Sequence, residues 1–270
     1  MGILNLTPDS FSDAGCFIEP PLAVERALAM VSEGADIIDI GGESTRPGAG
    51  AVSAAEEQDR VMPVIEALVP ELPVPVSIDT SKAEVMAAAV AAGVGFINDV
   101  RALREPGALD VAARSGASVC LMHMQGEPRT MQAAPEYADV VGEVFSFLME
   151  RVRVCERAGI GGERLVLDPG FGFGKTLAHN LALLRHLERF GEGGMAVLAG
   201  ISRKSMIGAI LADEDGPRPV EGRVHGSVAA ALVAAQRGAG IIRVHDVAAT
   251  ADALKMHQAL GGAPSAAPMA

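Results

Sequence analysis

Polar and charged residues stand at the carboxyl ends of short apolar runs throughout this sequence of 270 residues. They are Asn5, Asp39, Asp79, Asn98, His123, Asp168, Ser202 with Lys204, and Arg243 with His245. A single Asp at the end of such a run is more often a turn or capping residue than a functional one. Eight runs that all end in this way favour one shared site.

The residue types at these positions indicate two kinds of binding chemistry. The carboxylates of Asp79 and Asp168 can each accept paired, charge-assisted hydrogen bonds from the N–H and NH2 groups of a planar heterocycle. Asn98 offers the same ring a donor and an acceptor. The remaining groups are cationic or hydroxylic and suit phosphate or carboxylate: Thr45, Arg46, Ser202, Lys204, Arg243 and His245. We therefore expect a carboxylate pole for a ring and an opposite, cationic pole for an anion.

Two polar loops follow the first two apolar runs, at residues 7–13 and 42–48. Loops longer than usual are often functional, although ordinary surface loops remain an alternative. Another choice stays open at Asn98 and Asp99: neighbouring strand residues face opposite ways, and periodicity does not say which of the two faces the site.

Some motifs have simpler interpretations. The segment 168–176 resembles a phosphate-binding P-loop, but Pro169 stands where the first glycine is required, so we expect Lys175 to be a loop lysine. His179 and His186 lack a third partner for a metal. A lone strand-end histidine such as His123 is more often a hydrogen-bonded structural residue than a ligand.

The elements that must position these residues alternate along the chain. Strands are predicted at Met1–Leu6, Asp36–Gly41, Val74–Asp79, Gly95–Asp99, Ser118–Met124, Leu165–Asp168, Ala196–Ser202 and Gly240–Asp246. Helices are predicted at Pro21–Glu33, Ala54–Leu68, Lys82–Ala92, Pro106–Arg114, Tyr137–Ala158, Leu177–Phe190, Gly226–Arg237 and Val247–Leu260. Strands that are apolar on both faces indicate a parallel sheet covered by helices. About eight such units predict an α/β fold of the (β/α)8 TIM-barrel type, with its site at the carboxyl ends of the strands.

Composition limits the classes of partner. The net charge of −12 and the 3% of aromatic residues disfavour a nucleic-acid surface. Cys16, Cys120 and Cys155 have the odd number and wide spacing of reduced cytosolic thiols. We find no secretory signal and no apolar stretch long enough for a membrane span, so we expect a cytoplasmic protein. The predicted organisation is one barrel domain over residues 1–260 and a disordered tail over 261–270.

Eight sequence stretches resemble the dihydropteroate synthases, the pterin-binding TIM barrels of folate biosynthesis, and they occur in the family's order. They are MGILNLTPDSFSD (1–13), DIGGESTRPG (39–48), SIDTSK (77–82), INDV (97–100), CLMHMQG (120–126), LDPGFGFGK (167–175), SRKS (202–205) and IRVHD (242–246). The family, a target of sulfonamides, usually has an amino-terminal β-hairpin before its first strand. This chain starts at the strand itself, so we expect a barrel that lacks the hairpin.

The resemblance implies a role for each site residue. It places the pterin ring on Asp79, Asn98, Asp168 and Lys204, in a pocket lined by Met122 and Phe173. It places a diphosphate on Thr45, Arg243 and His245, and a Mg2+ bound to that diphosphate on Asn5. It implies that the two loops and Ser202 shape a p-aminobenzoate pocket, through Pro8, Asp9, Phe11, Arg46 and Pro47.

The implied reaction joins p-aminobenzoate to (7,8-dihydropterin-6-yl)methyl diphosphate and releases pyrophosphate. No covalent nucleophile is implied, and Asp79, Lys204, Arg243 and His245 would act electrostatically. The resemblance also implies a homodimer. Two alternatives remain open: a pterin-binding barrel without turnover, and a related methyltransferase domain that acts on methyltetrahydrofolate.

Overall fold

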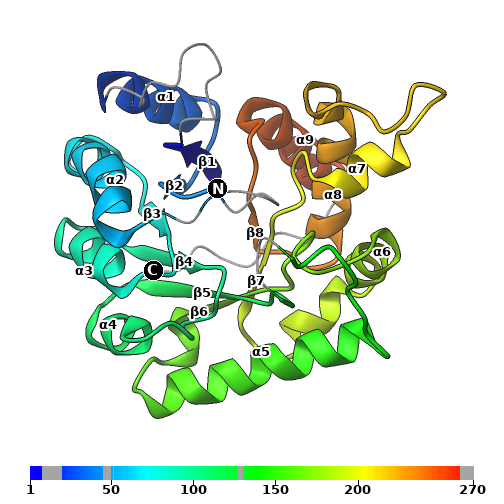
Figure 1. The fold of residues 1–270 in the computed structure, drawn as a ribbon. Helices are drawn as coiled ribbons and strands as arrows, with labels where there is room; N and C mark the ends of the chain where they lie inside the picture. Colours follow the sequence, from blue (N-terminus) through cyan, green and yellow to red (C-terminus); the bar gives the residue numbers. More distant parts are fainter. Residues whose placement is uncertain (8–19, 45–49, 51, 127–129, 262–270) are drawn as a thin grey trace.

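The computed structural model describes residues 1–7, 20–44, 50, 52–126 and 130–261. Its eight strands are parallel and neighbour one another in chain order, from β1 to β8. The strands lie in the centre of the molecule, and the helices surround them (Figure 1). This arrangement confirms the predicted (β/α)8 barrel.

The strands are short and mostly buried. Their bounds are β1 Gly2–Asn5, β2 Ile38–Gly41, β3 Val76–Asp79, β4 Phe96–Asp99, β5 Ser118–Met122, β6 Leu165–Asp168, β7 Ala196–Ala199 and β8 Ile241–Ile242. The helices are α1 Pro20–Ser32, α2 Ala54–Leu68, α3 Ala83–Ala91, α4 Ala108–Arg114, α5 Val140–Arg157, α6 Leu177–Arg185, α7 Ser205–Ile210, α8 Val224–Gln236 and α9 Val247–Ala259, with 3-10 turns η2 Gly162–Arg164, η3 Leu187–Gly191 and η4 Val220–Arg223. Side chains that point outward from the strands pack against the helices in one continuous apolar cluster, which extends from Leu4 to Val247.

The barrel closes where β8 meets β1. The N–H of Ile3 donates to the carbonyl of Val244 at 2.9 Å, and the N–H of Val244 donates to the carbonyl of Met1 at 3.0 Å. Gly2 and Val244 form a single isolated parallel bridge. In contrast, β4 and β5 share four consecutive register pairs. The closing seam therefore has fewer backbone contacts than the β4–β5 pair.

The interior of the barrel has an apolar half and a polar half. Phe96, Cys120, Val166 and Leu198 form a buried apolar cluster, against which Met1 and Ile241 pack. Two residues further along the same strands come polar or larger side chains, as in Phe96 to Asn98 and Val166 to Asp168. Because the side-chain period of a strand is two, the polar groups lie directly above the apolar layer, on its carboxyl-end side.

Several predicted element bounds are wrong. The strand predicted at Gly240–Asp246 is regular only over Ile241–Ile242, because the N–H groups of Arg243 and Val244 turn to different neighbours, Ala199 and Met1. The strands predicted to reach Met124 and Ser202 end at Met122 and Ala199. Helix α7 was not predicted, and the helix predicted to reach Phe190 ends at Arg185 before η3.

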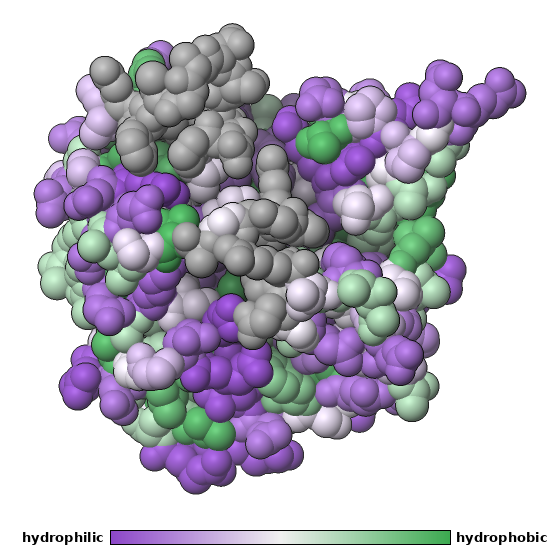
Figure 2. All heavy atoms as spheres, in the orientation of Figure 1, coloured by the Kyte–Doolittle hydropathy of each residue, from purple (hydrophilic) through white to green (hydrophobic). Residues whose placement is uncertain are grey.

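On the face drawn in Figure 2, hydrophobic residues occur in small groups among hydrophilic ones. Among the described residues, no helix has the length and apolar character that a membrane span requires.

Candidate active site

A buried hydrogen-bond network joins β2, β3, β4 and the residue after β8. Asp39 lies at its centre and is fully buried. Its Oδ1 accepts from the hydroxyl of Ser77 at 2.5 Å, and its Oδ2 accepts from Nδ2 of Asn98 at 3.1 Å and from Nε of Arg243 at 2.6 Å. The network settles the open choice on β4, since Asn98 faces the barrel interior. Asp99 instead accepts from the Ser81 hydroxyl and from the N–H groups of Arg101 and Leu103.

Arg243 links this network to a second carboxylate. Its NH2 group donates to Oδ2 of Asp79 at 2.7 Å. Burial opposes the charge of the guanidinium, but Asp39 and Asp79 outweigh this effect and raise the pKa of Arg243. Burial raises the pKa of Asp79 to about 7, against the opposing effect of Arg243. Arg243 is thus a fixed cation held between two carboxylates.

This contact corrects one expectation from the sequence. We expected the carboxylates and the cationic groups to form opposite poles, whereas Arg243 touches Asp39 and Asp79 directly. A buried guanidinium needs a compensating negative charge, and these carboxylates lie within its reach. The predicted carboxylate pole and the predicted cationic pole are therefore adjacent, not opposite.

Asp168 and Lys204 lie on the other side of the barrel mouth, close enough to influence each other's charge. One oxygen of Asp168 accepts from the N–H of Gly170 at 2.7 Å, and burial raises the pKa of this carboxyl group. Lys204 Nζ donates to the carbonyl of Phe171 and lies 4.5 Å from the ring centroid of Phe173. Burial lowers the pKa of Lys204 to about 8, although Asp168 favours its charged form. This side offers a carboxylate, an ammonium and an aromatic face to one ligand.

The turn after β7 is fixed from outside the barrel. Arg203 has a φ of 59° and forms a two-bond ion pair with Asp246, at 2.9 and 2.5 Å. Its N–H also donates to the Ser227 hydroxyl at 2.9 Å. Nδ1 of His245 lies 3.0 Å from Oγ of Ser202, so two predicted site residues with separate expected roles are in contact. The left-handed backbone of Arg203 is costly for a residue with a side chain, and these bonds to Asp246 and Ser227 help to offset that cost.

The end of β5 and the loop after β6 form the apolar wall of the site. Met122, Met124 and Met131 form a buried cluster with Phe173 and Val100 packed against it. This cluster contains two predicted pocket residues, Met122 and Phe173. Methionine adapts to irregular shapes and packs well against flat rings.

Lys175 ties these two segments together. It is a loop lysine, as predicted, but the structure adds that it is buried and only 3% exposed. Its Nζ lies 3.0 Å from Nδ1 of His123 and donates to the carbonyl of Phe173 at 3.0 Å. Burial lowers the pKa of Lys175 to about 7 and that of His123 to about 3. His123 is therefore a hydrogen-bonded structural residue, as predicted.

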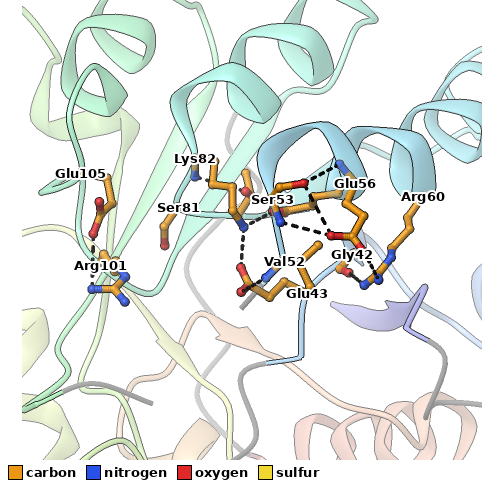
Figure 3. Close-up of polar contacts among 12 residues, drawn as sticks. Gly42, Glu43, Val52, Ser53, Glu56, Arg60, Ser81, Lys82, Arg101 and Glu105 are labelled. Carbon is orange, nitrogen blue, oxygen red and sulfur yellow. Dashed lines mark hydrogen bonds and ion pairs between the residues drawn. The ribbon is translucent and has the colours of Figure 1, made fainter. Parts of the chain in front are cut away.

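A charged cluster holds the base of the loop after β2 (Figure 3). Lys82 Nζ pairs with Oε2 of Glu43 at 2.5 Å and with the fully buried Glu57. The other oxygen of Glu43 accepts from the N–H of Val52 at 3.2 Å. Burial opposes the charge of Lys82, but its bonds to Glu43 and Glu57 outweigh this effect and raise its pKa. Glu43 thus joins the two ends of the loop to Lys82, the residue directly before α3.

The predicted magnesium ligand Asn5 ends β1 beside Asp79. A Cβ atom added to Gly41 would lie 3.6 Å from Oδ1 of Asn5 and 3.6 Å from Cβ of Asp79, so the missing side chain leaves space between them. The described residues contain no cluster of three or more His, Cys, Asp or Glu that could hold a metal. One amide oxygen from the protein fits Mg2+, which usually keeps waters and substrate phosphates as its other ligands.

Six predicted site residues lie outside the described residues: Pro8, Asp9, Phe11, Thr45, Arg46 and Pro47. The structure also adds contributors that sequence reasoning missed. Asp39 was noted as a strand-end residue but received no role, and Lys175, Glu43 and Lys82 received none. The run of glycines before Lys175 is a signal for close backbone packing that could have pointed to burial there.

The family model of the pterin-binding enzymes matches residues 1–245. A dihydropteroate synthase of Haemophilus influenzae is 54% identical over 263 residues, which cover 97% of this chain and 94% of the relative. A solved dihydropteroate synthase of Xanthomonas albilineans with 4-aminobenzoic acid has a TM-score of 0.89 and 57% identity, and covers 97% of this chain and 93% of that one. A structure of the enzyme from the same organism with 7,8-dihydropteroate has a TM-score of 0.86 and 54% identity at the same coverage.

The barrel and the site at its mouth therefore define a pterin-binding enzyme, and the chain belongs to that family. Within the family it groups with the dihydropteroate synthases, which are transferases.

Proposed function

We propose that this chain condenses p-aminobenzoate with (7,8-dihydropterin-6-yl)methyl diphosphate, giving 7,8-dihydropteroate and pyrophosphate. The observation that carries the proposal is the adjacency of Asp79, Asn98 and Arg243 in one buried network at the barrel mouth, with Asp168 and Lys204 across from it. Related synthases of Xanthomonas albilineans have been solved with 4-aminobenzoic acid and with 7,8-dihydropteroate.

The pterin ring would lie between the methionine wall and Lys204. Asp168 is positioned to accept hydrogen bonds from the N–H and NH2 edge of the ring. Nδ2 of Asn98 is committed to Asp39, so its Oδ1 remains as an acceptor for the ring. Asp79, beside Arg243, would face the other ring nitrogens and stabilise positive charge that develops on the methylene carbon.

The diphosphate would lie toward Arg243 and His245, with Thr45 of the second loop as a further donor. In this dissociative substitution, the bond between the methylene carbon and the diphosphate oxygen breaks first; the arylamine nitrogen then bonds to that carbon and loses a proton. Arg243 stabilises the negative charge on the departing oxygens. Asn5 would hold a Mg2+ that, when bound, supplies additional positive charge to the diphosphate. Pro8, Asp9, Phe11, Arg46, Pro47 and Ser202 would shape the p-aminobenzoate pocket.

This reaction needs no enzyme nucleophile, because the leaving group is already activated as a diphosphate. Cys120, inside the barrel, fits this view: burial raises the pKa of its thiol well above the ordinary value. Such a thiol stays protonated and packs as an apolar residue.

The test is an assay of pyrophosphate release with and without p-aminobenzoate, together with chromatographic detection of 7,8-dihydropteroate. We expect release that depends on the arylamine and stoichiometric product. Absence of product from a protein that still binds pterin would support the non-catalytic barrel instead. Methyl transfer from methyltetrahydrofolate that is unaffected by pyrophosphate would support the methyltransferase alternative.

Substitution of Asp168 tests the ring assignment. Asp168→Asn keeps the shape but removes the charge and one acceptor, so we expect kcat/KM for the pterin diphosphate to fall about 100-fold. Lys204→Ala should act in the same direction. Asp110→Asn, at an exposed acidic position of α4, is the matched control and should match the unsubstituted protein. Unchanged turnover in Asp168→Asn would contradict the assignment.

We further propose that the protein acts as a homodimer, as its resemblance to the family implies, and that it is cytoplasmic, as its cysteine usage indicates. Sedimentation analysis at micromolar concentration tests the dimer, and cell fractionation tests the location.

A further inference from the structure

We propose that Asp39 is a positioning residue that orients Asn98 toward the pterin and holds Arg243 at the leaving diphosphate. The inference rests on the proposed function, because Asn98 and Arg243 are assigned to the two ends of one substrate. No ligand contact is assigned to Asp39 itself.

The position of Asp39 in the barrel supports this role. It is fully buried in β2, and its partners Ser77, Asn98 and Arg243 come from β3, β4 and the end of β8. A buried carboxylate is costly unless it is paired and hydrogen-bonded. Here the same oxygen atom, Oδ2, accepts hydrogen bonds from both Asn98 and Arg243. One side chain therefore fixes the positions of these two residues relative to each other.

The bond to Asn98 decides which end of its amide faces the substrate. Nδ2 of Asn98 donates to Asp39 at 3.1 Å. The carbonyl oxygen is then the end that can accept from the pterin. Without an acceptor at residue 39, the amide could rotate and present a donor to a donor edge.

The bond to Arg243 decides where its guanidinium lies. Nε donates to Asp39 at 2.6 Å, and NH2 donates to Asp79 at 2.7 Å. Two carboxylates at neighbouring positions of the guanidinium fork fix its plane, which leaves NH1 as the nitrogen without a carboxylate partner among the described residues. A guanidinium fixed in advance stabilises a departing anion without reorganising during the reaction.

Ser77 makes the conservative variant feasible. Its hydroxyl now donates to Oδ1 of Asp39 at 2.5 Å, but a hydroxyl can also accept. In Asp39→Asn the new NH2 group can therefore donate to Ser77, while the remaining oxygen accepts from Asn98 and Arg243. This variant keeps the shape and the amide orientation and removes only the charge.

Two variants then separate the two effects. Asp39→Asn should lower kcat about 10-fold, because Arg243 is held less firmly, and leave KM for the pterin diphosphate within about 2-fold. Asp39→Ala frees both partners and should lower kcat about 100-fold and raise that KM about 10-fold. KM for p-aminobenzoate should stay unchanged in both. Asp36→Asn, at an exposed position before β2, is the matched control and should behave like the unsubstituted protein.

A double substitution tests whether Asp39 acts through Arg243. Lysine lacks the Nε of the guanidinium fork, so in the Arg243→Lys background Asp39→Asn should cost less than about 2-fold in kcat. An equal cost in both backgrounds would overturn the proposal, as would full kcat in Asp39→Asn. If the residue 39 variants do not fold, Ser77→Ala replaces them and should lower kcat about 3-fold without changing KM for p-aminobenzoate.

A readout without turnover separates this inference from the proposed function. The Nε–H nuclear magnetic resonance signal of Arg243, assigned by its loss in Arg243→Lys, should be protected from exchange and should broaden in Asp39→Ala. An inactive protein with this protected signal would refute the proposed reaction but retain the positioning role. If the protein is active but the Nε–H signal of Arg243 is the same with and without Asp39→Ala, the positioning role alone would be refuted.

Discussion

At the scale of single residues, burial and neighbouring charges together set the charge states around the barrel mouth. Arg243 stays charged between Asp39 and Asp79, whereas His123 stays neutral because burial and the neighbouring Lys175 both oppose its protonation. The sequence predicted most of these residue types at the site. It did not predict their pairing, because the contact of Arg243 with Asp39 joins residues 204 positions apart.

A pH titration tests the state of His123. Its pKa is lowered to about 3 in the folded protein, against an ordinary value of 6.5. As the pH falls below 6.5, His123 binds a proton in the unfolded chain but stays neutral in the folded protein. The free energy of unfolding therefore decreases on acidification between about pH 6.5 and pH 3. At pH 5 this loss amounts to about 2 kcal/mol.

His123→Gln cannot take up this proton and should lack that part of the loss. The measurement is urea unfolding at pH 7 and pH 5. The control is His225→Gln at an exposed histidine, which should keep the acid loss of the unsubstituted protein. The same acid loss in His123→Gln would show that His123 is not held neutral by the fold.

At the scale of elements, the loop after β6 lies directly on the backbone that follows β5. Gly170 and Gly174 have φ values of 72° and 62°, and a Cβ atom there would lie 1.9 Å from the carbonyl oxygen of His123 and 2.3 Å from that of Gln125. Tyr137 adds a hydrogen bond to the carbonyl of Gly174 at 2.9 Å. The two segments therefore form one wall of the barrel mouth, where we propose that the pterin binds.

Alanine substitution at Gly170 should disrupt this wall. The new methyl group would overlap a backbone oxygen, so we expect a loss of stability above about 3 kcal/mol and weakened pterin binding. Gly159→Ala is the matched control, because its φ is 90° but no atom lies within 4 Å of the added Cβ. It should lose only about 1–2 kcal/mol, the cost of the left-handed backbone. Thermal unfolding and pterin titration measure both; equal effects would contradict the contact.

Sequence patterns located most elements because the strands are apolar on both faces and the helices are periodic. They located β8 less well, since its hydrogen bonds alternate between β7 and β1, and they missed α7, which has only six residues. They also did not reveal that Lys175 is buried, because burial of a lysine depends on an acceptor such as His123, 52 residues away along the chain. Long-range pairing of this kind leaves no local periodicity to detect.

At the scale of the whole molecule, the barrel has a weak seam. β1 and β8 share one isolated bridge, whereas the β4–β5 and β5–β6 pairs each have four register pairs. Segments with fewer backbone contacts open more often below the global unfolding transition. We therefore expect the barrel to open first at this seam.

Hydrogen exchange tests the seam directly. The N–H groups of Ile3 and Val244 should exchange faster than that of Val119 in β5. Val244→Ala removes two buried methyl groups and should speed exchange at the seam about tenfold while Val119 changes little. Val119→Ala, the matched change in β5, should instead lower the global stability without a specific increase in exchange at the seam. Equal protection of all three N–H groups would contradict this picture.

The apolar layer of Phe96, Cys120, Val166 and Leu198 affects how substrates enter the site and how products leave it. Because this layer fills the barrel below the polar groups, we expect both substrates and both products to pass through the opening at the carboxyl ends of the strands. The compound that reaches the floor has to enter before anything that sits above it, so the architecture itself favours a compulsory order of binding and makes exit of the upper product a precondition for the next cycle.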